Sequence, residues 1–201
     1  MDDQAASDIE HRIALRLKEL RVARGLTLDA LAKRSGVSRS MISLIERAES
    51  SATASVLDKL AASLGVTLAS FFAEEGRADA APVARAAEQR SWRDPETGYV
   101  RRNLSPSFPS PIELVEVLLP PGTRVAYESG ARSSVVNQQI WVIAGEVEVT
   151  VGEGVHRLST GDCLAMRLDR PTAFRNEGTE TARYLVALTT DPSSMQMRAS
   201  Q

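Results

Sequence analysis

The sequence is poor in the residues that build disulfides, zinc sites and membrane spans. Cys163 is the only cysteine, so an internal disulfide and a multi-cysteine zinc site are excluded. No run of about 18 apolar residues occurs, which argues against a membrane span. The acidic start, Met1-Asp2-Asp3, lacks the apolar stretch of a secretory signal. Together these absences predict a protein of the reducing cytoplasm.

Charge is unevenly distributed along the chain. The 201 residues are 43% hydrophobic and 25% charged, which is typical of a folded protein with one large or two small domains. The net charge is −2, yet residues 12–59 contain ten lysines and arginines against five acidic residues. A basic segment in an otherwise acidic chain fits one domain that faces DNA, although solvated helix faces would give the same count.

The first third of the chain has helical periodicity. Apolar residues recur at spacings of three and four from Ile9 to Phe72, which predicts five short helices around a common core. The expected boundaries are a stop at Gly25, caps at Thr27 and Ser38, stops at Gly36 and Gly65, and a short last helix with Leu68, Phe71 and Phe72.

The rest of the chain has the alternation of short strands. Residues 74–90 are rich in alanine and polar residues, which predicts a linker between domains. From residue 91 to about residue 191, short apolar runs alternate with Pro, Gly and Asp turn signals, and the last ten residues, 192–201, form a tail. We therefore expect an α domain over 9–73 and an all-β sandwich or barrel over 91–191.

The stretch LTLDALAKRSGVSRSMISLIE, residues 26–46, carries the most specific pattern. It has two helices joined by Ser35-Gly36-Val37-Ser38, in which glycine permits a positive φ and Val37 packs inward. This segment resembles the helix-turn-helix of lambda-repressor-like (XRE) regulators, and the resemblance extends from Ile9 to Phe72. In the family, glycine commonly stands at Ala48 and proline at Ala52, so this chain departs at a turn.

The resemblance implies that the third helix enters the major groove of double-stranded DNA. Arginine pairs with guanine and serine contacts base edges or phosphates, while exposed N–H groups at helix starts hold phosphates. The residues implied to contact DNA are Thr27, Lys33, Ser38, Arg39, Ser40, Ser43 and Arg47. The family pattern also implies that Glu46 pairs with Arg21 in the first helix. Such domains usually act as homodimers on palindromic operators.

The second half resembles the cupin (double-stranded β-helix, jelly-roll) barrel. The resemblance rests on Leu119-Pro120-Pro121-Gly122, on residues 138–146 (QQIWVIAGE), on Gly161-Asp162 and on residues 170–176 (RPTAFRN). Metal-binding cupins hold a metal with three histidines and a glutamate. Here the glutamate position holds Gln138, one histidine position holds Thr172, and the other two fall at Ala131 and Ser133 or at Arg132 and Ser134. We therefore expect neither metal nor other cofactor, and we interpret His11 and His156 as surface residues.

The barrel could still hold one small molecule. Candidate pocket residues are Arg124, Tyr127, Gln138, Trp141, Arg167, Thr172, Phe174 and Asn176, of which strand alternation allows about half to face inward. We interpret Cys163 as a buried structural thiol.

The sequence thus predicts a dimeric DNA-binding transcriptional regulator that is not an enzyme, with a metal-free barrel that senses an unidentified effector. Two alternatives stay open: the barrel serves only for dimerisation, or it is a cupin enzyme fused to a DNA-binding arm.

Overall fold

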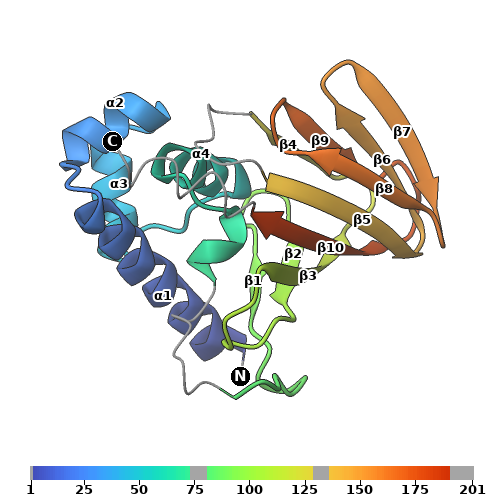
Figure 1. Cartoon of the computed structure of the whole chain (residues 1–201), viewed down its shortest axis with the longest axis horizontal. Helices are drawn as coiled ribbons and strands as arrows, with labels where there is room; N and C mark the ends of the chain where they lie inside the picture. The colour runs from blue at the N-terminus through green and yellow to red at the C-terminus, as the bar shows by residue number, and fades with distance from the viewer. Residues whose placement is uncertain (1, 73–80, 129–135, 191–201) are drawn as a thin grey trace.

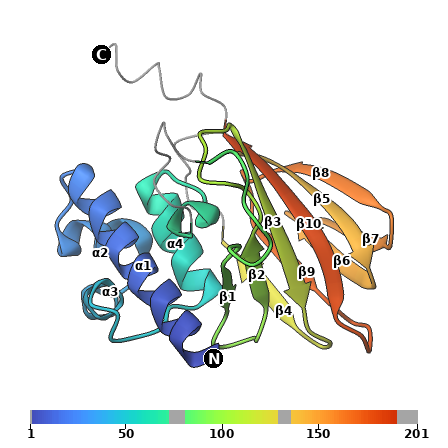
Figure 2. The same ribbon diagram turned by 90° about the horizontal axis from the view of Figure 1, so that it is seen from below.

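The computed structural model describes residues 2–72, 81–128 and 136–190, and it divides into a helical layer and two β-sheets. The helices lie on one side of the molecule and the sheets on the other, with α4 (Ala54–Leu64) between them (Figures 1 and 2). Residues 73–80, which include the first part of the linker expected over 74–90, and residues 191–201, which include the tail expected over 192–201, lie outside the described residues.

The helical part contains α1 (Asp2–Ala23), α2 (Leu28–Ser35), α3 (Arg39–Glu46), α4 and the 3₁₀ helix η1 (Leu68–Phe71). The predicted caps are confirmed: Thr27 accepts from Ala30 N and Ser38 from Met41 N. The prediction of a fifth α-helix is wrong, because the described hydrogen bonds of η1 are of the i→i+3 type, such as Ser70 N to Thr67 O at 3.1 Å.

The β part consists of two antiparallel sheets. The first has the order β1-β2-β3-β10-β5-β8 and the second β4-β9-β6-β7. Their strands are β1 (Ser91–Arg93), β2 (Val100–Asn103), β3 (Ile112–Leu119), β4 (Arg124–Tyr127), β5 (Val136–Ala144), β6 (Glu146–Val151), β7 (Gly154–Ser159), β8 (Cys163–Arg167), β9 (Thr172–Arg175) and β10 (Ala182–Thr190). Alternate residues of β5 are buried, so one face of this strand lines the interior and the other faces outward.

The outward face of β5 accounts for a wrong prediction about Cys163. Cys163 is exposed, not buried, and it is the cross-strand partner of Trp141, which is 50% exposed. Paired residues of neighbouring strands project to the same side of a sheet. Both side chains therefore lie on the outer face of the six-stranded sheet.

The helical and β parts share one continuous apolar core. The rings of Phe72 and Trp92 lie 5.5 Å apart across the junction, and both side chains are buried. The buried carboxylate of Asp94 accepts from Ala54 N at 3.0 Å, so a β-part side chain binds the first turn of α4. A negative charge is favourable at a helix N-terminus, which makes this contact a specific link between the two parts.

No helix in the described ranges combines the length and apolar character needed to cross a membrane.

Candidate nucleic-acid interface and ligand cavity

The turn between α2 and α3 holds the two helices at a fixed angle. Gly36 ends α2 with a left-handed φ of 70°, and Val37 is only 7% exposed. Ser38 then starts α3 with its side chain on Met41 N at 3.2 Å. Glycine is suited to that φ because it has no Cβ to clash. The first turn of α3 is thereby left at the surface, with Ser38, Arg39 and Ser40 all exposed.

Arg39 lies at the start of α3 and is loosely held. Its Nε lies 3.2 Å from Asp29 Oδ1, and the two side chains are 65% and 76% exposed. Ion pairs this exposed contribute little to stability. The guanidinium can therefore leave Asp29 for another acceptor at small cost, as pairing with a guanine requires.

Ser43 and Arg47 lie at the far end of the same exposed face. Arg47 Nη1 donates to Ser43 Oγ at 2.8 Å, while its Nε and Nη2 each donate to Glu49 at 2.8 Å. These hydrogen bonds raise the pKa of Arg47 and lower that of Glu49. A phosphate contact through Arg47 would have to replace the Glu49 carboxylate. Lys33 and Thr27 are exposed on α2 and at its N-terminus.

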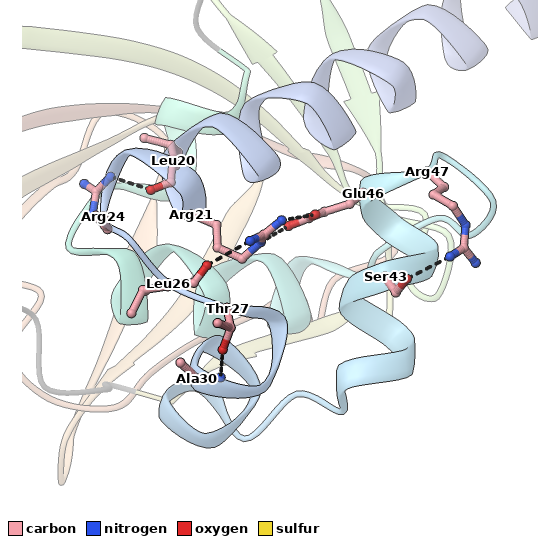
Figure 3. Close-up of polar contacts among 9 residues, drawn as sticks. All are labelled: Leu20, Arg21, Arg24, Leu26, Thr27, Ala30, Ser43, Glu46 and Arg47. Atoms are coloured by element: carbon pink, nitrogen blue, oxygen red, sulfur yellow. Dashed lines mark hydrogen bonds and ion pairs between the residues drawn. The ribbon is translucent and has the colours of Figure 1, made fainter.

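Arg21 and Glu46 brace α1 against α3, as the family resemblance implied (Figure 3). Arg21 Nε donates to Glu46 Oε1 at 2.6 Å and Nη2 donates to Oε2 at 2.8 Å, while Nη1 donates to Leu26 O at 2.8 Å. The hydrogen bonds that Arg21 donates to Glu46 raise the pKa of Arg21 despite the opposing effect of burial. A bidentate pair of this kind fixes orientation as well as distance, so it sets how α3 is presented.

A second candidate site is a cavity of about 50 Å³ at the junction of the two parts. Its lining residues are Asp58, Thr67, Leu68, Tyr99, Arg101, Val117, Tyr127, Gln138, Leu168, Thr172, Phe174, Tyr184, Val186 and Leu188. Four predicted pocket residues are therefore brought together here: Tyr127, Gln138, Thr172 and Phe174. Phe174 stacks on Tyr184 at 5.9 Å and meets Tyr127 edge-on at 6.0 Å.

The other four predicted pocket residues do not line this cavity, and the prediction is corrected for them. Arg124, Trp141 and Arg167 are exposed, because they occupy outward positions on their strands. Asn176 is buried in a structural role, since its amide donates to Leu119 O at 2.9 Å and Glu180 O at 2.8 Å.

Arg101 and Tyr99 were missed by the sequence analysis. Both are buried, and Arg101 Nη1 donates to the Tyr99 hydroxyl at 2.8 Å. Burial also raises the pKa of Tyr127 and Tyr184 well above the usual value, so both phenols keep their protons. The alternation of short apolar runs over 91–191 predicted strands in this part of the chain, but it carried no sign that Arg101 points inward.

The donor set does not fit a metal of the kind that cupins bind. Gln138 and Thr172 both line the cavity, and they supply an amide and a hydroxyl where a carboxylate and an imidazole would be needed. The two remaining expected positions, at 131–134, lie outside the described residues. Within the described ranges, His, Cys, Asp and Glu side chains form no group of three that could hold a metal.

Comparisons with known proteins agree with this two-part organisation. Residues 17–71 match the HTH_3 (helix-turn-helix) family model and residues 115–188 match the Cupin_2 (cupin domain) model. The Escherichia coli K12 protein "HTH-type transcriptional regulator SutR" is 28% identical over 169 residues, which cover 84% of this chain and 89% of that one. The E. coli K12 regulator PuuR is 27% identical over 183 residues, with 87% and 92% covered. A crystal structure of an HTH_3 family transcriptional regulator from Vibrio cholerae has a TM-score of 0.71 at 28% identity, covering 92% of this chain and 98% of that one.

Proposed function

We propose that this chain, which carries an XRE-type helix-turn-helix domain followed by a cupin domain, is a cytoplasmic transcriptional regulator that binds DNA sequence-specifically as a homodimer. In this proposal residues 9–73 bind DNA, 74–90 link the domains, 91–191 form the cupin domain and 192–201 form a tail. The relatives named as transcriptional regulators support the general function.

The observation that carries the proposal is the exposed first turn of α3. Ser38, Arg39 and Ser40 face solvent beyond a turn that buries Val37, and the partner that the described residues offer Arg39 is the exposed carboxylate of Asp29. We assign Arg39 to base recognition and Ser40 and Ser43 to base or phosphate contacts. Thr27, Lys33, Ser38 and Arg47 are assigned to the phosphate backbone.

The dimer contact is assigned to the outer face of the six-stranded sheet. Ile112, Leu114 and Trp141 project from this face and are 53%, 38% and 50% exposed. Leu185 lies between them, because it pairs with Trp141 on β5 and with Glu116 on β3. Large apolar residues gathered on one surface favour association, and a second copy would cover them while holding two α3 helices for a palindromic site.

Sedimentation equilibrium tests this dimer assignment. Trp141→Glu is expected to shift the protein toward the monomer, whereas Val155→Glu should not. Val155 is a matched control because it is 57% exposed on β7 of the other sheet. A wild-type protein that is monomeric at micromolar concentration would contradict the assignment.

The cupin cavity is proposed to sense a small molecule without a metal. The support is the cavity itself, with its buried arginine and phenols, and the poor fit of Gln138 and Thr172 to metal ligation. Stoichiometric metal in the protein purified from cells would contradict the metal-free state.

DNA titrations of matched variants test base recognition by α3. On a cognate site, Arg39→Ala is expected to cost about 1–3 kcal/mol and to relax preference at one base pair. Arg170→Ala, which removes an exposed arginine of the cupin domain, should leave both affinity and preference unchanged. Equal affinity and equal base preference for Arg39→Ala and wild type would overturn the assignment of Arg39.

A further inference from the structure

We propose that the cavity binds a short aliphatic carboxylate through Arg101, and that the bound ligand clamps the DNA-binding domain onto the cupin domain. This inference deepens the effector role proposed above. It depends on that proposed function only for its consequence at DNA.

Arg101 is a buried charge that forms no ion pair with any of the described residues, and Glu113 acts on it only through a longer-range electrostatic attraction. The residue is 8% exposed, and its Nε has no hydrogen-bond partner among the described residues. Among the described residues, no carboxylate lies within ion-pair distance of the Arg101 guanidinium, and the one hydrogen bond that the guanidinium makes goes to the Tyr99 hydroxyl. An arginine stays charged in proteins, and an unpaired buried charge is costly. An anionic ligand would supply the missing partner.

Tyr99 adds a donor beside the guanidinium. Its hydroxyl oxygen accepts from Arg101 Nη1 at 2.8 Å and from the Tyr127 hydroxyl at 3.2 Å. A phenol has one proton of its own to donate, and in both of these hydrogen bonds the Tyr99 hydroxyl oxygen is the acceptor. The Tyr99 proton therefore remains available for a ligand oxygen. A guanidinium and a phenol side by side suit the two oxygens of a carboxylate.

The size and the apolar lining select a short aliphatic acid. The cavity volume is about 50 Å³, and one water needs about 10–15 Å³ by this measure, so the space holds only a few heavy atoms. Val117, Val186 and Leu188 form an apolar wall. Sulfate and phosphate would leave polar oxygens against this wall, whereas the methyl or ethyl group of acetate or propionate would pack on it.

The DNA-binding domain contributes one wall of the same cavity. Asp58 from α4, Thr67 and Leu68 line it, and they are 3%, 4% and 8% exposed. Thr67 Oγ also donates to Glu113 Oε2 of β3 at 2.9 Å, across the junction. In this proposal the ligand carboxylate lies at the Arg101 guanidinium and the Tyr99 hydroxyl, and its alkyl end lies against the apolar side chains of the lining.

A ligand held in this way contacts both domains. It therefore has higher affinity for the docked arrangement than for any arrangement in which α4 moves away. Because α4 packs against α2 of the helix-turn-helix, carboxylate binding is coupled to the position of the DNA-reading helices.

Calorimetric titration of the full-length protein tests the ligand class. Sodium acetate, propionate and butyrate are compared with propionamide, 1-propanol and sodium phosphate at matched ionic strength. A carboxylate is expected to bind at least about tenfold more tightly than propionamide, since a charged hydrogen-bonded pair is worth that factor or more. Equal binding of amide and acid would overturn the proposal, as would preferential binding of phosphate or no binding of any acid.

Two variants localise the site. Arg101→Met should abolish carboxylate binding, while Arg102→Met, which changes the adjacent arginine paired with Glu116, should not. If Arg101→Met fails to fold, Tyr99→Phe is used and should weaken binding by roughly tenfold. Unchanged binding in Arg101→Met or Tyr99→Phe would overturn the assignment.

Hydrogen exchange tests the clamp without DNA. Propionate is expected to slow exchange in α4 and η1 as well as in β2. Protection confined to the strands would refute the clamp. Carboxylate binding with this protection pattern would support the ligand proposal even if the protein selected no specific DNA. The absence of specific DNA would then contradict only the proposed function, so the two failures are distinguishable.

Discussion

Replacing Asp94 with alanine is expected to destabilise the whole protein by about 3 kcal/mol. The Asp94 side chain is 2% exposed and accepts from Ala54 N at 3.0 Å, from Thr97 N at 3.1 Å and from the Thr97 hydroxyl. Alanine removes the acceptor, which leaves the Ala54 N–H at the start of α4 without a partner. Each unsatisfied buried donor costs about 1–3 kcal/mol, and the lost charge at the helix N-terminus adds up to about 1 kcal/mol.

Urea unfolding followed by two probes measures this effect. Far-UV circular dichroism reports the helices, and Trp92 fluorescence in a Trp141→Phe background reports the junction. Both curves should shift together, because Asp94 joins the two domains into one cooperative unit. Glu96→Ala, an exposed carboxylate in the same turn, is the control and should change stability by less than about 0.5 kcal/mol. A loss below about 1 kcal/mol in Asp94→Ala, or a shift in only one probe, would show that Asp94 does not join the two domains into one cooperative unit.

Three further substitutions have defined outcomes in the same unfolding assay. Glu46→Gln should lower the free energy of unfolding by about 2–4 kcal/mol, because it leaves the largely buried Arg21 guanidinium without its anionic partner. A loss below about 0.5 kcal/mol would show that this ion pair contributes little to stability. Ala48→Gly should stabilise by about 0.5–1 kcal/mol, since Ala48 has a left-handed φ of 54°, and any loss of stability would contradict this account. Burial raises the pKa of Glu113, so the folded state binds its proton more tightly, and the stability present at low pH is lost as the pH rises through the folded pKa. Glu113→Gln should therefore be more stable than wild type at pH 7–8, and the difference should vanish below about pH 4, where the wild-type carboxyl is also neutral.

The helix-turn-helix was predictable because its signals are local. Gly36 and Ser38 mark the turn through backbone conformation and capping, which depend on a few neighbouring residues. The Arg21–Glu46 pair joins residues far apart in sequence, and the family resemblance supplied it. The last helix was mispredicted because apolar spacing does not distinguish one 3₁₀ turn from a short α-helix.

The cavity was only half predictable, because the inward side of a strand is set by tertiary packing. Gln138 and Trp141 are three residues apart on β5, so they must face opposite sides of the sheet, and the structure places Gln138 inside. Arg101 lies on the short strand β2 at the domain junction, where its environment depends on residues from several distant segments. The contribution of Thr67 to the cavity depends on how the two domains dock, which no local pattern encodes.

The proposed function depends above all on recognition of a specific DNA sequence by α3. The most direct test is to select fragments of the source genome with the purified protein and to sequence those that it retains. We expect a two-fold symmetric site with half-sites about one helical turn apart, upstream of a small number of genes, and we expect Arg39→Ala to lose it. Sequence-specific binding would be contradicted if the retained fragments shared no common sequence, with or without added carboxylates, and if moderate salt abolished their retention.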